Sequence, residues 1–269
     1  MRYFLLSEVP FGQDGDYSEQ AMLACANGFL ANALGNLQMR VLSLIFKNCE
    51  GAMPQPCPGE SDGGEADGYS NAELTADDEA LLLEARELRS KIAPLMATQQ
   101  LHKACGVVDA CVRSANKYID EQAPWALKKT DLARMGTTLW VLAETLRHVA
   151  IVASPFMPSA STAMLDQLAV PEDERSLGNL TPPEAVPGGD QRSTADSLAA
   201  IQFSVKPGTA ILKPTGVFPR IELDDGTDAA AAAAAPPKGG QKKGAKIAGS
   251  RVSDGEIDCF NKYRIMRNN

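Results

Sequence analysis

The stretch that decides the fold is LANALGNLQMR, from Leu30 to Arg40. It opens a series of apolar side chains spaced three and four residues apart, which is the pattern of an amphipathic helix with one buried face. We predict that this helix begins at about Glu19, after the capping residue Ser18, and ends at about Lys47. The apolar positions are Leu30, Leu34, Leu37, Val41, Leu44 and Ile45.

Polar residues follow a second line along the same helix. Asn36 and Arg40 stand four residues apart, so their side chains share one face and can reach the same target. A planar amide beside a planar guanidinium can hydrogen-bond to the edge of a nucleobase. The alternative is that both residues belong to the solvated flank of a bundle helix, where charged residues are common. Spacing alone favours the solvated flank.

The same helical pattern recurs further along the chain. Thr75 caps a second predicted helix, which Pro94 ends or kinks. The remaining predicted helices cover about 101–120, 131–153 and 159–168, and Trp125 follows Pro124 just past the end of the first of these. Each helix has a single apolar face, and several connections are short. We therefore predict an all-α fold, an antiparallel helical bundle.

Composition divides the chain into four parts. We interpret residues 1–17 as a linker segment, 18–170 as the helical domain and 171–223 as a short extended strip that closes the core. Residues 224–269 form a low-complexity basic tail with seven consecutive alanines, and we expect this tail to be disordered. A loop at 51–70 is rich in proline, glycine and acidic residues.

Charge and cysteine usage exclude several kinds of site. Residues 229–269 carry a net charge of +5, whereas the preceding 228 residues carry −13, so any RNA contact must come from a localised site. The six cysteines form no Cys-x-x-Cys pair, and the two histidines, His102 and His148, lie far apart in the sequence. A metal site is therefore not predicted. No run approaches the roughly eighteen apolar residues of a membrane span, so we expect no membrane partner.

Several motifs together resemble the C-terminal half of methionyl-tRNA synthetases of the bacterial and organellar type. The resemblance extends in order over about residues 2–223. Its motifs are Arg2-Tyr3-Phe4-Leu5-Leu6, Asn32-x2-Gly35-Asn36-Leu37-x2-Arg40, Ala115-Asn116-Lys117-Tyr118-Ile119-Asp120-Glu121-Gln122-Ala123-Pro124-Trp125, Pro155-Phe156-Met157-Pro158 and Phe218-Pro219-Arg220-Ile221.

The resemblance implies a class I synthetase anticodon-binding domain. In that family a tryptophan stacks on an anticodon base, while an asparagine and an arginine one turn apart read base edges. Carried over by motif, these residues are Trp125, Asn36 and Arg40. The alternative for Trp125 is packing beneath the bundle. For Asn116 we expect a structural role, holding the turn at Pro124.

The resemblance also implies what the whole enzyme does. Members of the family attach methionine to its tRNA with ATP and Mg²⁺, using a His-Ile-Gly-His motif and a Lys-Met-Ser-Lys-Ser motif. This sequence contains neither motif, so we expect no cofactor in this chain and no ligase activity from the chain alone. The zinc-binding cysteine pairs of many members are not found in this sequence, and neither is the C-terminal oligonucleotide-binding fold of some members.

Two functions follow as hypotheses. The chain is the anticodon-binding part of a methionine–tRNA ligase, with methionine tRNA and a separate catalytic half as partners. Alternatively, it is a free-standing helical module that binds tRNA or a ribonucleoprotein without ligation. Asn36, Arg40 and Trp125 favour anticodon recognition in either case. The expected location is the cytoplasm or an organelle matrix or stroma, and the sequence does not choose between them.

Overall fold

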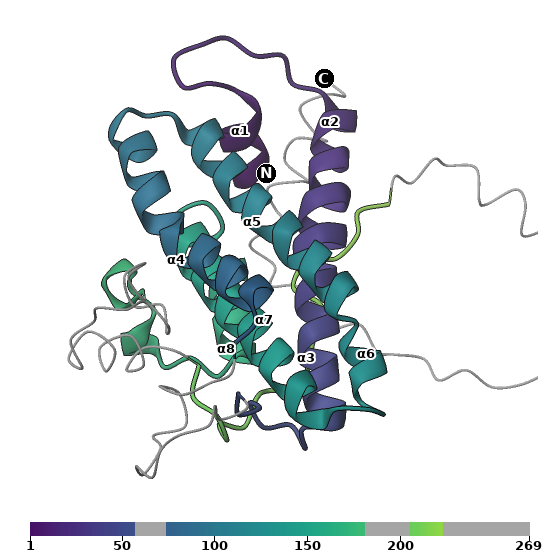
Figure 1. Ribbon diagram of the computed structural model, residues 1–269. Coiled ribbons are helices and arrows are strands. Elements are labelled where there is room, and N and C mark those ends of the chain that lie inside the picture. The colour runs from purple at the N-terminus through teal and green to yellow at the C-terminus, as the bar shows by residue number, and fades with distance from the viewer. Residues whose placement is uncertain (57–73, 181–204, 223–269) are drawn as a thin grey trace, which may run out of the picture. The chain divides into compact units, whose positions relative to one another are not determined.

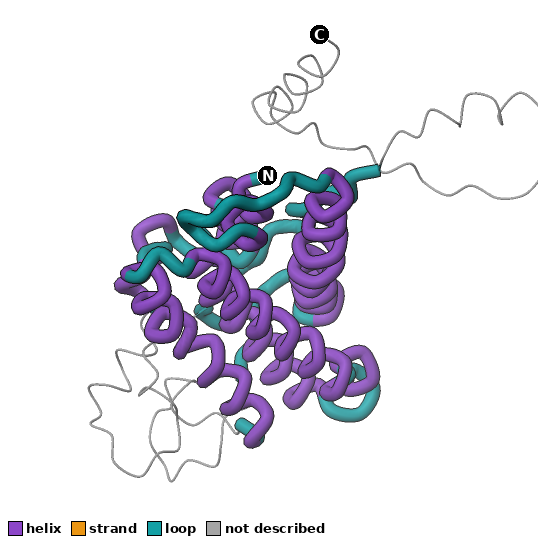
Figure 2. Tube along the Cα trace, turned by 90° about the horizontal axis from the view of Figure 1, so that it is seen from above, coloured by secondary structure: helices purple, strands orange, loops and turns teal. Residues whose placement is uncertain are grey.

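The computed structural model describes residues 1–56, 74–180 and 205–222. Within them the chain forms helices joined by loops, and no strand is present in this part of the chain (Figures 1 and 2). The predictions made for most of the acidic loop, for residues 181–204 and for the basic tail lie outside the described residues. The helices are α1 (Arg2–Glu8), α2 (Glu19–Ala24), the π-helix η1 (Cys25–Gly35), α3 (Asn36–Asn48), α4 (Ala76–Ala97), α5 (Leu101–Gln122), α6 (Pro124–Leu127), α7 (Leu132–Ala153), α8 (Pro158–Gln167) and the 3₁₀ turns η2 (Glu172–Glu174) and η3 (Leu177–Asn179).

The bundle is built around α7. Helices α3, α4, α5 and α8 all pack against it, and α4 and α5 form an antiparallel pair joined by only three residues (Figure 1). Every residue of α7 from Met135 to Ala153 is buried. The prediction of an all-α helical bundle is therefore confirmed, with one helix enclosed on every side.

The helix predicted from Glu19 to Lys47 is continuous in the structure, but its middle is not α-helical. Over Cys25–Gly35 the backbone forms a π-helix, and the amide of Asn36 donates to the carbonyl oxygen of Ala31, five residues back. Such i→i+5 bonding widens the helix and shifts the faces that a 3.6-residue repeat predicts. Of the side chains predicted to be buried, Leu30 on the π-helix and Leu44 on α3 are only half-buried, whereas Leu34 is fully buried.

By length and composition, this helix could also cross a membrane. Glu19–Asn48 contains an 18-residue window with a mean hydropathy of 1.3, of which 39% is buried. This differs from the expectation that no segment is long and apolar enough. In the structure, Leu37, Val41 and Ile45 of this helix are buried in the core shared with the other helices. The helix thus has the packing of a core element of the bundle.

Local sequence signals explain where two of the long helices begin. The side chain of Thr75 and that of Asp78 form a capping box at the start of α4, as the sequence predicts. The carboxylate of Asp131 accepts a hydrogen bond from the amide of Arg134 at 2.9 Å and caps α7. Residues 2–8, interpreted from sequence as part of a linker segment, form helix α1, whose Tyr3 and Phe4 are buried.

An extended strip at 205–222 runs back over the bundle. Near its start it pairs with residues 51–53, where the amide of Met53 donates to Thr209 and the amide of Ile211 donates to Gly51, both at 2.8 Å. Near its end, the side-chain amide of Asn27 on η1 bonds to both backbone groups of Ile221 at 2.9 Å. The strip therefore joins the 51–53 segment to the π-helix.

Candidate nucleic-acid interface

Asn36 and Arg40 lie in the part of the long helix that has regular α geometry. Helix α3 begins at Asn36, directly after the π-helix ends, so the two side chains are one α-helical turn apart, about 6 Å along the axis. Asn36 is exposed, and 30% of the Arg40 side chain is exposed. Both residues therefore have polar groups that a ligand can reach.

Trp125 is presented by a sharp corner between α5 and α6. Helix α5 ends at Gln122, and Ala123 adopts a left-handed conformation with φ of 42°. A residue with a Cβ in this region costs about 1–3 kcal/mol, and such strain is concentrated at functional sites. Pro124 then starts the one-turn helix α6, because its fixed φ suits the first helical position. The corner leaves Trp125 46% exposed, so the alternative of packing beneath the bundle is wrong.

The fold brings Arg40 and Trp125 together, although they are far apart in sequence. The guanidinium carbon of Arg40 lies 5.3 Å from the centre of the Trp125 ring, which is within range of a cation–π contact. The Nη2 atom of Arg40 also donates to Oδ1 of Asp120 at 2.6 Å. Asp120 thus holds the guanidinium beside the tryptophan, and an exposed aromatic and a planar donor share one surface.

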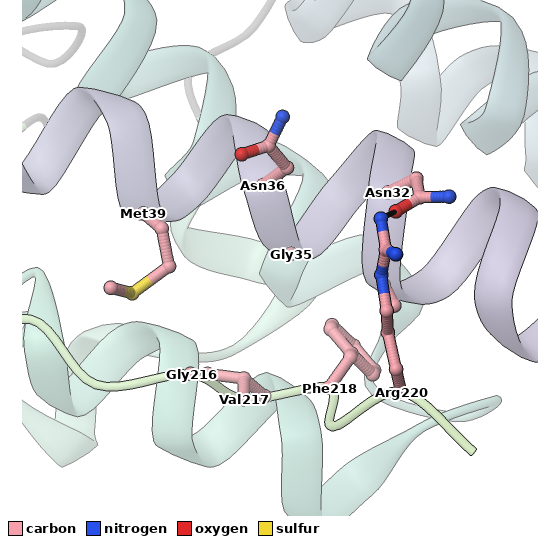
Figure 3. Close-up of a pocket in the computed structure, with 9 residues that line it drawn as sticks. Asn32, Gly35, Asn36, Met39, Gly216, Val217, Phe218 and Arg220 are labelled. Atoms are coloured by element: carbon pink, nitrogen blue, oxygen red, sulfur yellow. Dashed lines mark hydrogen bonds between the residues drawn. The ribbon is translucent and has the colours of Figure 1, made fainter. Parts of the chain in front are cut away.

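Asn36 lies on the rim of a neighbouring pocket of about 270 Å³. Figure 3 shows this pocket between the helix and the part of the strip that runs from Gly216 to Arg220. Gly35 faces the strip, whereas the amide of Asn36 points away from it (Figure 3). The structure thus places Asn36 between the Arg40–Trp125 pair, one turn along α3, and this pocket.

Asn116 does not hold the Pro124 turn, so that expectation is wrong. Its side-chain amide donates to the carbonyl oxygens of Ala33 at 3.2 Å and Val112 at 2.9 Å. The contact to Ala33 ties α5 to the π-helix, where an i→i+5 pattern leaves carbonyl groups displaced from α-helical partners. Asn116 therefore helps to set the distance between α5, which precedes the corner with Trp125, and the π-helix, which continues into the helix with Arg40.

Potential metal ligands are not clustered in the part of the chain that the structure describes. Within residues 1–56, 74–180 and 205–222, no three His, Cys, Asp or Glu side chains are grouped so that they could hold a metal ion. Cys105 and Cys111 are buried free thiols, and burial raises the pKa of each to about 12. Thiols in this state are protonated and unreactive.

Comparison with known proteins places the chain in a family. Residues 70–235 match a family model described as the anticodon binding domain of methionyl tRNA ligase. The chain belongs to this family. Curated relatives include the methionine–tRNA ligase of Brucella suis, 43% identical over 84% of this chain and 37% of the relative, and that of Mesorhizobium japonicum, 40% identical over 85% of this chain and 38% of the relative.

A solved structure gives the same result. The apo form of Mycobacterium tuberculosis methionyl-tRNA synthetase matches with a TM-score of 0.67 and 36% identity, over 82% of this chain and 38% of that chain. This chain therefore spans about 37% of the length of the curated relatives it matches. The fold and the family show an anticodon-binding domain of a tRNA ligase, and such a domain binds tRNA.

Within this methionyl-tRNA ligase domain, sequence reasoning missed a buried ionic cluster on α7. Glu144 accepts hydrogen bonds from Arg147 at 2.7 and 3.0 Å and from the amide of Val205 at 3.0 Å, and it contacts His148 at 3.1 Å. The side chains of Glu144, Arg147 and His148 are each at most 1% exposed. Burial favours the protonated form of Glu144, but the positive charge of Arg147 and the hydrogen bonds from Arg147 and His148 outweigh it and hold the pKa of Glu144 well below its usual value. Burial lowers the pKa of His148.

The cluster fixes the start of the strip that later reaches the pocket. Arg147 also donates to the carbonyl oxygen of Asn179 at 3.2 Å, and the indole of Trp140 donates to that of Val205 at 3.1 Å. Charged residues inside an apolar helical pattern give a signal for such a cluster, because buried charges require partners. Their partners, Asn179 and Val205, follow tens of residues later and have no local sequence signal.

Proposed function

We propose that this chain is the part of a methionine–tRNA ligase that recognises the anticodon of methionine tRNA. Trp125 stacks on one unpaired anticodon base, and Arg40 and Asn36 hydrogen-bond to base edges. Sequence-specific recognition of RNA acts mostly on unpaired bases that are stacked on aromatic side chains and bonded on their edges. The observation that carries the proposal is the Arg40 guanidinium held 5.3 Å from an exposed Trp125 ring, with Asn36 one turn away.

The activity proposed for the whole ligase is ATP-dependent attachment of methionine to this tRNA, with ATP used together with Mg²⁺. A relative of known structure binds methionyl-adenylate, the product of methionine activation. The sequence of the present chain contains neither ATP-site motif of the family, so we infer that methionine activation requires a separate catalytic half. We assign the complex to the cytoplasm or to an organelle matrix or stroma.

A charge-matched pair of variants tests the recognition. Arg40→Gln removes the guanidinium beside Trp125, while Lys47→Gln removes one positive charge from an exposed position on the same helix. Fluorescence anisotropy with a labelled anticodon stem–loop of sequence CAU measures both variants at fixed salt. We expect Arg40→Gln to lose about 1–3 kcal/mol of binding and most of its discrimination against an altered anticodon. Equal behaviour of the two variants would contradict the proposal.

Catalytic independence is tested by pyrophosphate exchange with methionine and ATP. We expect the chain alone to give the rate of a no-enzyme blank, while a full-length methionine–tRNA ligase serves as the positive control. Exchange above the blank would show that the chain activates methionine without a partner.

A further inference from the structure

The corner that carries Trp125 belongs to a loop whose two ends are bonded to each other. Residues 123–133 lead from the end of α5 through α6 into the first turn of α7 (Figure 1). Gln122 is the last residue of α5, and Arg134 lies in the first turn of α7. The Nη2 atom of Arg134 donates to Oε1 of Gln122 at 2.8 Å. This side-chain hydrogen bond closes the base of the loop that contains Trp125.

Arg134 is itself held by a buried carboxylate on α4. Its guanidinium donates to both oxygen atoms of Asp78, from Nη1 to Oδ2 and from Nη2 to Oδ1 at 2.8 Å. Asp78 is fully buried, and it also accepts from the hydroxyl group of Tyr118 and from the amide of Thr75. A buried charge requires its partners, so this pair has one favourable arrangement. Arg134 therefore offers Gln122 a donor at a fixed position.

The side-chain amide of Gln122 makes a second contact to α4. Its Nε2 atom donates to Oδ2 of Asp77 at 3.3 Å, and Asp77 lies beside Asp78 in the first turn of that helix. One side chain therefore ties the end of α5 to both α4 and α7. Helix ends fray when nothing holds them, so these two contacts stabilise the last turn of α5.

Three residues transmit the position of this helix end to the tryptophan. Ala123 has a φ of 42°, a conformation that persists for a residue with a Cβ only where the surrounding structure determines it. Its carbonyl oxygen accepts from the amide of Ala126 at 2.8 Å, which encloses Trp125 in a tight turn. Pro124, between the two, is buried. The direction of the ring therefore follows from the position of Gln122.

The same turn of α5 also holds the partner of Arg40. Asp120 lies two residues before Gln122 and pairs with the guanidinium of Arg40 at 2.6 Å. That guanidinium lies 5.3 Å from the centre of the Trp125 ring. A displaced end of α5 would therefore move the ring and the carboxylate together, and with them the whole stacking surface.

We propose that Gln122 and Arg134 are positioning residues for base recognition. Their hydrogen bond holds the end of α5, so that the Trp125 ring is ordered for stacking before the RNA arrives. This assignment rests on the proposed function. A group that is already ordered loses less conformational freedom on binding, and preorganisation of this kind raises affinity.

Substitution of Gln122 tests the assignment without disturbing the buried charges. Gln122→Met keeps the length and the helix propensity of the side chain but removes both of its hydrogen-bonding groups, while Arg134 retains Asp78. Gln20→Met, at an exposed position of α2, is the matched control. We expect Gln122→Met to raise the Kd for a CAU stem–loop about 3- to 10-fold at fixed salt, which is the cost of ordering one side chain on binding. The control should bind as the wild-type chain does.

A double-mutant cycle shows whether Gln122 acts through the ring. In a Trp125→Ala background, Gln122→Met should change the Kd by less than about twofold, because the group that it positions is gone. A general loss of structure would instead weaken both backgrounds. Thermal melts of all variants show that the bundle is folded.

Fluorine NMR of the free chain, labelled with fluorotryptophan, gives a readout that does not depend on RNA. The chain has two tryptophans, and the Trp125 resonance is the one lost in Trp125→Phe. We expect this resonance to shift or broaden in Gln122→Met, while that of the buried Trp140 stays unchanged. Gln122→Glu keeps an acceptor for Arg134 and should retain the wild-type resonance.

The outcomes separate the two proposals. A loss of affinity in Gln122→Met that disappears in the Trp125→Ala background, with a changed Trp125 resonance, supports the positioning role. Wild-type affinity in Gln122→Met, an equal loss in both backgrounds or an unchanged Trp125 resonance overturns this role and leaves the proposed function standing. If the wild-type chain binds CAU and altered anticodons equally, the proposed function itself fails.

Discussion

Replacing Trp125 with alanine removes the aromatic surface on which the proposed recognition depends, while leaving the bundle intact. The side chain is 46% exposed and belongs to a one-turn helix, so it adds little to the buried core. Its one aromatic–cation contact among the described residues is to Arg40, at 5.3 Å from the ring centre. Such a contact is worth about 0.5–1 kcal/mol at an exposed site. We therefore expect a small change in stability.

The expected effect on RNA binding is larger. Stacking of a base on an aromatic side chain is worth about 1–3 kcal/mol, which corresponds to about a 5- to 150-fold rise in Kd. Arg40 also loses the ring that lies beside it, although the ion pair with Asp120 at 2.6 Å still orients its guanidinium. The loss of affinity is therefore expected to come mainly from the missing ring.

Tryptophan fluorescence provides a direct assay. The chain contains two tryptophans, and the second, Trp140, is 6% exposed and bonded to the strip through its indole. Quenching on addition of a CAU stem–loop should therefore come from Trp125 and disappear in Trp125→Phe, whereas anisotropy of labelled RNA gives the Kd of Trp125→Ala. Wild-type affinity in Trp125→Ala, with an unchanged melting temperature, would refute the stacking role.

Three further predictions concern neighbouring charges and the core. Asp120→Asn removes the carboxylate that pairs with Arg40; we expect a rise of a few-fold in affinity for every stem–loop and weaker anticodon discrimination in the same titration, with stability changed by less than about 1 kcal/mol. Acidification should lower the free energy of unfolding measured in urea, because the pKa values of His148 and Glu144 are both depressed in the folded chain. As the pH falls, the unfolded chain therefore takes up protons before the folded chain does, first near pH 6.5 and then in the carboxyl range. A free energy of unfolding that stays constant from pH 7 to 4 would contradict this. Asp78→Ala leaves three hydrogen-bonding partners of a fully buried carboxylate without an acceptor, and thermal melts should show a loss of roughly 3–5 kcal/mol, whereas a loss below about 1 kcal/mol would argue against the network.

Periodicity and capping residues predicted most of the long helices. The capping residues Thr75 and Asp131 lie where the sequence expects α4 and α7 to begin, because caps act within one turn of the backbone. The sequence did not predict the π-helix, because the 3.6-residue spacing of apolar side chains describes an α-helix and does not reveal i→i+5 hydrogen bonding. The enclosure of α7 was missed as well, because a single apolar stripe predicts one solvated face.

The candidate site shows the same limit of local reasoning. Spacing within one helix pairs Asn36 with Arg40, but it cannot connect either residue with Trp125, and only the family resemblance made that connection. Asp120 and Arg220 lie 80 and 188 residues from the partners they contact, Arg40 and Asn32, so no local pattern identifies them. Tertiary structure alone assembles these contacts.

The central claim is that this chain distinguishes the methionine anticodon from others. The most direct measurement is the ratio of Kd values for two stem–loops that differ only in the anticodon, CAU and an altered triplet, with the wild-type chain at one fixed salt concentration. We predict that CAU binds at least about tenfold more tightly, because one mismatched contact to a base costs about 1–3 kcal/mol. Equal affinity for the two RNAs would contradict the claim.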